Sequence, residues 1–315
     1  YDVVLSKNPD YLFYSIHNRE PLFKNSLSKG ELIRSISPKL YSTLRKIVIL
    51  IQKKFSKKKK LSEGNFIKIL YSAENQRPDM SECDWAFSSF PEEEINHPRY
   101  FRIPMHSMTN YPFHKEFELP FKRRKVDFKK LKKEKTRFCN FIYSQEVQGR
   151  NNFFKLLSKH KHIDSPGRCM NNMAPINGPD PRKSRFSKKW AKNKLNFIKK
   201  YKFTIAYENA ISPGWITEKL THPLLVNSIP IYIGTKSVRE DFNTKAFINY
   251  NDFNNMEDFI RHILEVDKDE KLYQKYLCEP FFKNKGQHYF STSQRISDKL
   301  NSIIEIEEKK KQLKK

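Results

Sequence analysis

The amino-acid sequence predicts an α/β protein of two domains, followed by a charged helical tail. The length of 315 residues corresponds to about two domains of ordinary size. In the second half of the chain, short apolar runs alternate with amphipathic segments, which is the pattern of βαβ units on a parallel sheet. Aromatic residues make up 14% of the chain and supply the buried area that disordered chains lack.

Residues 1–134 are predicted to form the first domain, a sheet with intervening helices. The predicted strands are aromatic or β-branched runs bounded by Pro, Asn, Gly or charged residues, namely 11–15, 46–52, 66–72 and 85–89. Two lysine-rich stretches, 53–60 and 122–135, interrupt this region. Like-charge runs usually lie solvated in loops or on helix faces, and we place the connection between the domains in the second stretch.

Residues 135–290 are predicted to form the second domain, in which strand and helix alternate. Its predicted strands are 138–143, 203–207 and 229–233, and its predicted helices are 152–160, 216–226 and 256–276. Residues 291–315 are predicted to form the tail, a charged helix whose apolar residues recur near helical spacing, namely Ile296, Leu300, Ile303, Ile304 and Leu313.

The chain is strongly basic, with 61 Lys and Arg residues against 35 Asp and Glu and a net charge of +26. This charge favours partners such as phosphates, nucleotides, anionic lipid or nucleic acid. The sequence has no helix-turn-helix, RNA-recognition or zinc-finger signature, so nucleic-acid binding is not expected. The longest apolar run, 47–51, is too short to span a membrane, and the four cysteines show no CxxC pattern and are expected to be free thiols.

Polar residues that follow predicted strands are the first candidates for a site, because ligands of open α/β sheets bind beyond the carboxyl ends of the strands. The segment 207–219 leaves a strand, turns through Ser-Pro-Gly and enters a helix, and it carries Asn209, Glu218 and Lys219. A helix N-terminus with a lysine in its first turn suits a pyrophosphate, because free N–H groups, the helix dipole and an ammonium converge there. From spacing alone, the alternative that Glu218 only caps the helix and Lys219 is solvated stays open.

Two further side chains stand at ends of predicted strands. Arg150 lies at a strand-to-helix turn, where a guanidinium can clamp a phosphate, although an arginine at a turn is unremarkable in so basic a chain. Glu74 stands at the tip of the predicted strand 66–72 in the first domain, just after its last residue. It is a candidate general base, although most glutamates at strand ends are simply hydrated. Asp267 and Asp269 fit a loose DxD metal-binding pattern, which we reject because it lies between helical segments and away from the strand ends.

Several segments closely resemble the donor-binding signature of the alpha-1,3-fucosyltransferases, glycosyltransferase family ten. They are 207–209, 214–220, 229–234, 241–243 and 247–249. Other landmarks of that family have matches in the same order at 8–10, 71–75, 99–104, 138–141, 149–150 and 164–167. The resemblance covers about residues 8 to 285. It implies a GT-B fold, in which two Rossmann-like domains face each other across a cleft, with the acceptor held mainly by the first domain and GDP-fucose by the second.

The resemblance also implies an inverting transfer of L-fucose from GDP-β-L-fucose to O3 of an N-acetylglucosamine unit by direct displacement. Glu74 matches the proposed general base, and Tyr71 lies beside the same pocket. Other positions match the donor site: Arg150 and Lys219 match phosphate contacts, and Asn209, Trp215 and Glu218 match residues that line the nucleotide sugar. Glu218 would bind sugar hydroxyls or stabilise positive charge that develops on the fucose ring. A catalytically silent nucleotide-sugar or glycan-binding protein on the same fold is the alternative.

No metal or other cofactor is expected, because Arg150 and Lys219 supply the countercharge for the departing diphosphate. The expected partners are GDP-fucose and an N-acetyllactosamine-type or other GlcNAc-containing glycan. The basic end 305–315 is similar to the amphipathic ends by which bacterial members bind the inner membrane, which implies a cytoplasmic, membrane-associated protein. A Golgi location is the alternative if an N-terminal anchor has been removed.

Four positions depart from the resemblance, among them Ala210, which stands where serine is frequent. Trp215 stands where tyrosine is common, and Ile233 stands where many relatives have tryptophan. Pro223 lies inside the predicted helix after Lys219, and a proline there costs on the order of 3 kcal/mol unless the turn is already distorted. We therefore expect a shortened helix or weaker donor binding.

Overall fold

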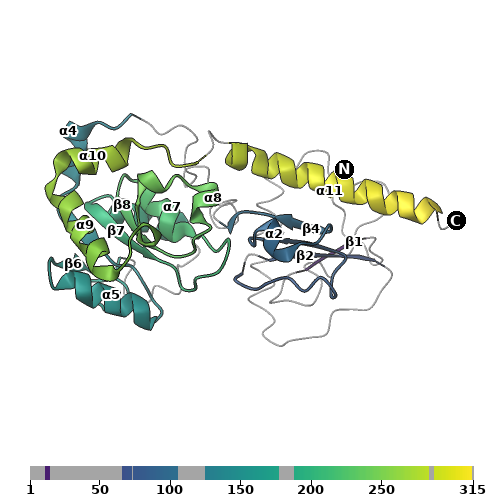
Figure 1. Cartoon of the computed structure of the whole chain (residues 1–315), viewed down its shortest axis with the longest axis horizontal. Coiled ribbons are helices and arrows are strands. Elements are labelled where there is room, and N and C mark those ends of the chain that lie inside the picture. Colours follow the sequence, from purple (N-terminus) through teal and green to yellow (C-terminus); the bar gives the residue numbers. More distant parts are fainter. Residues whose placement is uncertain are drawn as a thin grey trace. The chain divides into compact units, whose positions relative to one another are not determined.

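The computed structural model describes residues 11–14, 66–72, 74–105, 125–176, 188–283 and 287–313. The chain divides into two compact units, and in the colours of Figure 1 the first unit contains both the blue strands and the yellow helix α11. The first unit combines Tyr1–Pro112 with Gln287–Lys315, and the second is Phe113–Gly286. The predicted strand 46–52 and the lysine-rich stretch 53–60 lie outside the described residues.

The first unit contains a parallel sheet of four strands in the order β1-β2-β3-β4. The strands are β1 (Tyr11–Tyr14), β2 (Ile67–Tyr71), β3 (Trp85–Ser88) and β4 (Tyr100–Arg102), and one short helix, α2 (Glu92–Ile95), precedes β4. The predictions for β1, β2 and β3 are confirmed. The sequence did not predict β4, because three residues are too few to show an alternating pattern.

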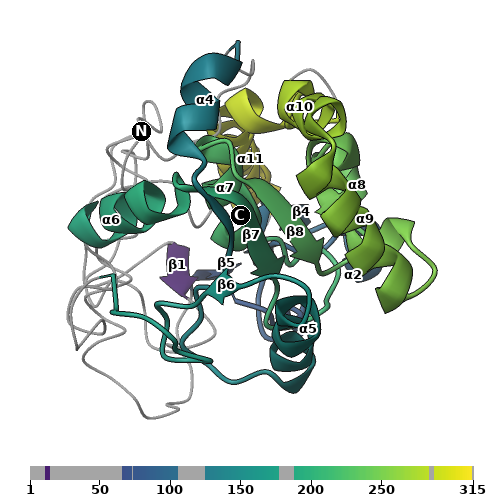
Figure 2. The same ribbon diagram turned by 90° about the vertical axis from the view of Figure 1, so that its left-hand side faces the viewer.

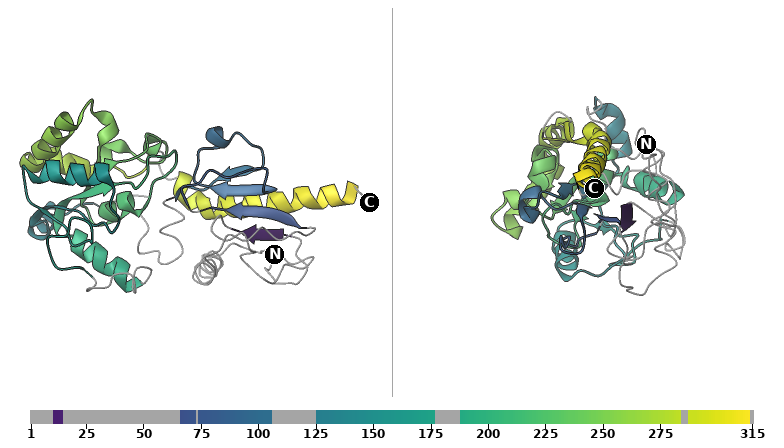
Figure 3. Two further views of the ribbon diagram at one scale, coloured as in Figure 1. Left: turned by 90° about the horizontal axis from the view of Figure 1, so that it is seen from below. Right: turned by 90° about the vertical axis from the view of Figure 1, so that its right-hand side faces the viewer.

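The helix α11 (Gln287–Leu313) belongs to the first unit and does not stand apart as a tail. Its apolar residues Ile296, Leu300, Ile303 and Ile304 are buried. Trp85 of β3 donates a hydrogen bond through Nε1 to Glu307 Oε1 at 3.2 Å. Figure 3 shows the helix running along the sheet of the first unit. The predicted helix is therefore confirmed. It packs within the first unit and is not a separate tail, because an apolar stripe of this length needs a surface to cover it.

The second unit is built on a parallel sheet of five strands in the order β6-β5-β7-β8-β9. The strands are β5 (Arg137–Asn140), β6 (Ile163–Asp164), β7 (Tyr201–Tyr207), β8 (Ile229–Ile233) and β9 (Ile248–Asn249). The helices are α4 (Phe128–Glu134), α5 (Gln148–Ser158), α6 (Lys188–Ile198), α7 (Glu218–Leu225), α8 (Val238–Asp241), α9 (Met256–Lys268) and α10 (Glu270–Cys278). Two single 3₁₀ turns, η3 (Thr244–Ala246) and η4 (Tyr250–Asp252), flank β9.

Helices cover both faces of this sheet. In Figure 2, α6 lies on one side of the strands, and α5 and α9 lie on the other. The rings of Phe153 of α5 and Phe259 of α9 pack in a tilted arrangement with their centroids 5.6 Å apart, and they share a core with Phe203 and Ile231. All five residues of β8 are buried, which explains its uninterrupted apolar sequence.

Three boundaries in the second unit differ from the predictions for physical reasons. The predicted helix 256–276 is two helices, because the Asp269 carboxylate caps α10 by accepting the N–H groups of Lys271 and Leu272. The helix α5 begins at Gln148, so Arg150 lies in its first turn and not before it. The helix α4 forms within the stretch 122–135 and belongs to the second unit, because Leu131 joins the core of that unit.

Within the described residues, none of the helices combines the length and the apolar character that crossing a membrane requires. All four cysteines, Cys83, Cys139, Cys169 and Cys278, are free, as the sequence predicts.

Candidate functional site

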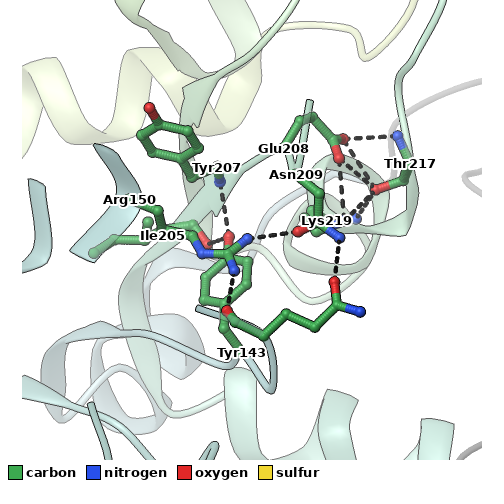
Figure 4. A network of polar contacts seen from close by, with 9 residues as sticks. Tyr143, Arg150, Ile205, Tyr207, Glu208, Asn209, Thr217 and Lys219 are labelled. Carbon is green, nitrogen blue, oxygen red and sulfur yellow. Dashed lines mark hydrogen bonds and ion pairs between the residues drawn. The ribbon is translucent and has the colours of Figure 1, made fainter. Parts of the chain in front are cut away.

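The candidate site lies at the carboxyl end of β7 and the N-terminus of α7, within the second unit (Figure 4). Tyr207 is the last residue of β7, and Glu208 and Asn209 follow it directly. The loop then turns at Gly214, whose φ of 72° is a left-handed conformation that favours glycine. The Gly214 N–H donates to Ser237 Oγ at 2.8 Å, which ties this loop to the segment after β8.

Thr217 is the N-cap of α7, since its Oγ1 accepts the N–H of Lys219 at 3.3 Å. Glu208 is fully buried and accepts both the Thr217 N–H at 2.8 Å and the Thr217 hydroxyl at 2.9 Å. The Lys219 ammonium lies 3.1 Å from Glu208 Oε2, and the Lys219 side chain is only 15% exposed. The alternative interpretation, in which Glu218 caps the helix and Lys219 is solvated, is therefore wrong.

The charge states follow from these contacts. Burial opposes a charged Lys219, but the carboxylates of Glu208 and Glu218 outweigh it and raise the Lys219 pKa above its ordinary value. Burial likewise opposes an ionised Glu218, but Lys219 and Lys194 outweigh it and lower the Glu218 pKa to about 2. At neutral pH the first turn of α7 thus presents a carboxylate beside an ammonium.

Arg150 and Asn209, far apart in the sequence, meet in this site. Arg150 Nη1 donates to Asn209 Oδ1 at 2.6 Å, and Nη2 donates to the carbonyl of Gln145. The guanidinium lies 3.8 Å from the centroid of the Tyr143 ring, which is a cation–π geometry. Within the described part of the chain, Arg150 Nε has no hydrogen-bond partner. Arg150 is fully buried, so a phosphate reaches it only if residues that cover it move.

Trp215 lies in the loop before α7 and is half-buried. Its backbone N–H donates to the carbonyl of Ser212 at 3.1 Å. Its indole Nε1 is buried and has no partner among the residues that the structure describes. Ile211 in the same loop is 66% exposed. The loop before α7 therefore combines an exposed apolar side chain with a buried indole donor.

The other two predicted site residues belong to the first unit. Tyr71 ends β2, and Glu74 lies three residues further along, half-buried, with its N–H donating to Ser72 Oγ at 3.4 Å. Both residues therefore lie at the carboxyl end of β2, Tyr71 as its last residue and Glu74 just beyond it, as the sequence predicts. Their meeting with Arg150 and Lys219 stays a prediction of the family resemblance.

A sequence model of one enzyme family, glycosyltransferase family 10 (fucosyltransferase), C-terminal part, matches residues 131–305. That is more than half of the chain. The chain belongs to glycosyltransferase family 10. The match includes β5 to α10, and with them every residue of the site around Lys219.

Relatives with established names agree with this assignment. The alpha-(1,3)-fucosyltransferase FucT of Helicobacter pylori is 28% identical over 251 residues, which are 75% of this chain and 52% of the relative. The GDP-fucose protein O-fucosyltransferase 3 of Homo sapiens is 27% identical over 221 residues, which are 64% of this chain and 45% of the relative. The chain thus spans about half the length of these curated relatives.

A solved structure of an alpha1,3-fucosyltransferase with GDP-fucose is also similar to this family 10 protein. The two share 26% identity and a TM-score of 0.55, and the match covers 69% of this chain and 67% of the other. The predicted fold class is confirmed: this is an α/β protein with two Rossmann-like units, as in GT-B enzymes.

The family 10 site contains residues that the sequence analysis did not single out. Glu208 and Thr217 complete the hydrogen-bond network around Lys219, and the ring of Tyr143 packs against the guanidinium of Arg150. A threonine directly before the predicted helix is an N-cap signal that could have been used. Glu208 lies beside Asn209 in the sequence, but only its complete burial marks it as unusual.

The two acids of the rejected DxD pattern have structural partners. Asp267 forms ion pairs of 2.6 Å with both Lys161 and Lys202, and Asp269 caps α10. Within the described ranges, no three His, Cys, Asp or Glu side chains gather in a way that could hold a metal ion.

Of the four departures, Pro223 lies inside α7, which has eight residues and continues for two residues after it. A proline has no N–H, so the carbonyl four residues earlier loses its usual helical partner there. The helix is shorter than the predicted 216–226 chiefly because it begins at Glu218, directly after the N-cap Thr217, and Pro223 does not end it.

Proposed function

We propose that this protein is an alpha-1,3-fucosyltransferase that moves L-fucose from GDP-β-L-fucose to O3 of an N-acetylglucosamine unit. The observation that carries the proposal is the N-terminal turn of α7, where the Lys219 ammonium and the Glu218 carboxylate meet at the positive end of the helix dipole in a chain of family 10. The names of the relatives and the GDP-fucose in the similar solved structure support this donor.

The proposed reaction is a single displacement. The acceptor hydroxyl attacks C1 of fucose and forms the new glycosidic bond, while the bond from C1 to the phosphate oxygen breaks and its electron pair leaves with GDP. Glu74 takes the hydroxyl proton as attack proceeds. Inversion at C1 converts the β-linked donor into an α-linked product.

The residues of the second unit would stabilise the charges that this reaction creates. The Lys219 ammonium neutralises the departing diphosphate. Arg150 adds a second cation once the residues that cover it move. The Glu218 carboxylate, ionised at neutral pH, stabilises positive charge on the fucose ring. Asn209 and Trp215 line the nucleotide sugar. No metal is required, because the countercharge comes from these side chains.

Two alternatives concern the acceptor and the chemistry. A protein hydroxyl is the second candidate acceptor, because one relative is named a protein O-fucosyltransferase. A catalytically silent protein that only binds the nucleotide sugar or a glycan is the other alternative.

Transfer assays separate these possibilities. Purified protein is incubated with GDP-fucose and N-acetyllactosamine, a panel of other glycans, or peptides, and the product linkage is determined. Transfer to O3 of N-acetylglucosamine supports the proposal, and transfer only to peptides favours the second acceptor. Calorimetric binding of GDP-fucose without transfer to any acceptor favours the silent protein.

Variants test the assigned residues. We expect Lys219→Ala to lower kcat/KM by about 100- to 1,000-fold, since it removes one charge from the leaving group. We expect Glu74→Gln to lower kcat by about 100- to 10,000-fold through loss of the base. Lys271→Ala and Glu93→Gln are matched controls on exposed helix faces. Turnover at the wild-type rate in both site variants would refute the assignments.

We also propose that the basic end of α11 brings the protein to an anionic membrane surface in the cytoplasm. The apolar stripe of α11 is buried in the first unit, so this contact would depend on charge, at about 1 kcal/mol for each lysine near the lipid. Lys309 and Lys310 lie on that end. Changing both to glutamate should reduce sedimentation with anionic vesicles, and equal sedimentation of the variant and the parent would contradict the proposal.

A further inference from the structure

Glu208 is an acid in the core of the second unit. Its side chain has no exposed surface, and its backbone N–H donates to the carbonyl of Ile233 at 2.9 Å, which fixes it as a continuation of the sheet. Taking a carboxylate out of water costs several kcal/mol, so such a group is tolerated only with strong partners. The structure provides three donors: the Thr217 N–H, the Thr217 hydroxyl and the Lys219 ammonium.

The surrounding backbone leaves room for this acid. A Cβ atom added at Gly234 would lie 3.1 Å from Glu208 Cγ and 2.4 Å from the hydroxyl of Tyr232, which is itself fully buried. Glycine at this position therefore permits the carboxylate to lie under the N-terminus of α7. The acid therefore lies close to the backbone after β8 on one side and bonds to Thr217 and Lys219.

We infer that Glu208 is a positioning residue that holds the Lys219 ammonium charged and directed at the donor diphosphate. This inference rests on the proposed function. Lys219 is only 15% exposed, and without a partner a lysine so enclosed tends to lose its proton and its fixed direction. Thr217 assists, because its Oγ1 lies 3.1 Å from the Lys219 ammonium as well as bonding to Glu208.

The charge on Lys219 depends on groups from four elements. Glu208 follows β7, Glu218 and His222 lie on α7, Arg150 lies on α5, and Lys194 lies on α6. The two carboxylates favour the charged ammonium, whereas burial and Arg150 oppose it. Lys194 acts on Glu218 and His222.

The two titratable neighbours on α7, Glu218 and His222, keep one charge state between pH 7 and 9.5. Burial lowers the pKa of His222 to about 3, so this side chain is neutral there. Glu218, with a pKa of about 2, is ionised throughout. Removing the Glu208 charge leaves Lys219 with one carboxylate against burial and Arg150, so its pKa falls and it loses its proton as pH rises.

The test is the binding of GDP by calorimetry between pH 7 and 9.5. The wild-type affinity should be nearly constant, since Lys219 stays charged. Glu208→Gln keeps the shape but not the charge, and we expect GDP binding weaker by about tenfold at pH 7, or ~1.4 kcal/mol, with a growing loss at higher pH. Glu208→Asp retains the charge and should restore a flat profile. A purely structural role would weaken binding equally at every pH.

A double-mutant cycle distinguishes an effect of Glu208 on GDP binding that acts through Lys219 from a direct effect of Glu208. Lys219→Ala should bind GDP weakly at every pH, and adding Glu208→Gln to it should cost no further affinity. A flat pH profile for Glu208→Gln, or a further tenfold loss in the double variant, would overturn the inference. Wild-type protein that fails to bind GDP would instead overturn the proposed function, and the inference with it.

A measurement on the wild-type protein covers the case in which Glu208→Gln does not fold. Acetylation of individual lysines by an anhydride, read by mass spectrometry from pH 7 to 11, reports the deprotonated fraction of each amine. Lys219 should titrate above 10.5, the ordinary pKa of a lysine side chain. Titration of Lys219 below 10.5 would show that Glu208 does not hold the charge, and would refute the inference.

Discussion

We predict that the helix α11 contributes strongly to the free energy of unfolding of the first unit. The variant Ile303→Ala tests this prediction. Ile303 is fully buried, and Ile303→Ala removes three carbon atoms from the contact. At about 0.8 kcal/mol for each buried carbon, the transfer of these atoms is worth ~2.4 kcal/mol, and the cavity left behind adds to it. We therefore expect the free energy of unfolding of the first unit to fall by about 3 kcal/mol.

The control lies on the same helix. Leu313 is 88% exposed, so Leu313→Ala should change the unfolding free energy by less than about 0.5 kcal/mol. The two variants remove apolar side chains of equal carbon number from one element and differ chiefly in burial.

The assay uses the tryptophan of the first unit. The chain has three tryptophans, and of these only Trp85 lies in the first unit, where its ring lies 5.1 Å from the Lys299 ammonium. In a background with Trp190→Phe and Trp215→Phe, urea unfolding followed by fluorescence reports on the first unit alone. A loss of about 3 kcal/mol lowers the urea midpoint by roughly 1 M or more. Equal midpoints for Ile303→Ala and Leu313→Ala would refute the reasoning.

Two further predictions concern the second unit. Burial lowers the pKa of Lys135 from 10.5 to about 7, so between these values the unfolded chain binds more protons than the folded one, and the unfolding free energy should rise as pH increases from 7 to 9. Lys135→Met should abolish this rise and the exposed Lys130→Met should not; urea unfolding at several pH values measures both, and an unchanged slope in Lys135→Met would contradict the assignment. Gly214→Ala should destabilise the unit by about 1 kcal/mol, because φ is 72° there, with Ser212→Ala as the control in thermal unfolding; equal melting temperatures would contradict it.

The elements predicted correctly are those whose local sequence and tertiary surroundings agree. The strand β8 is buried on both faces, so its whole sequence is apolar and could not be missed. The helix α9 buries one stripe that includes Phe259 and Ile263, which gives it a clear helical period. The two-residue strands β6 and β9 were not predicted, since they extend over too few residues to show a period.

The proximity of the predicted site residues has two origins. Asn209, Glu218 and Lys219 share one segment after a strand, so their proximity follows from the chain itself. The contact of Arg150 with Asn209 joins residues 59 positions apart, and no local pattern encodes it. It depends on β5 and β7 being neighbours in the sheet.

The sequence alone determined which chemical groups stand at the ends of the strands and that they resemble a donor site, because motif residues and apolar runs are local properties. Tertiary structure decided the environment of those groups. It buried Glu208 beneath Lys219, placed the Arg150 guanidinium against Tyr143, and laid α11 along the first sheet. Burial and neighbouring charge fix a side chain's ionisation and direction, and both arise only when distant segments pack together.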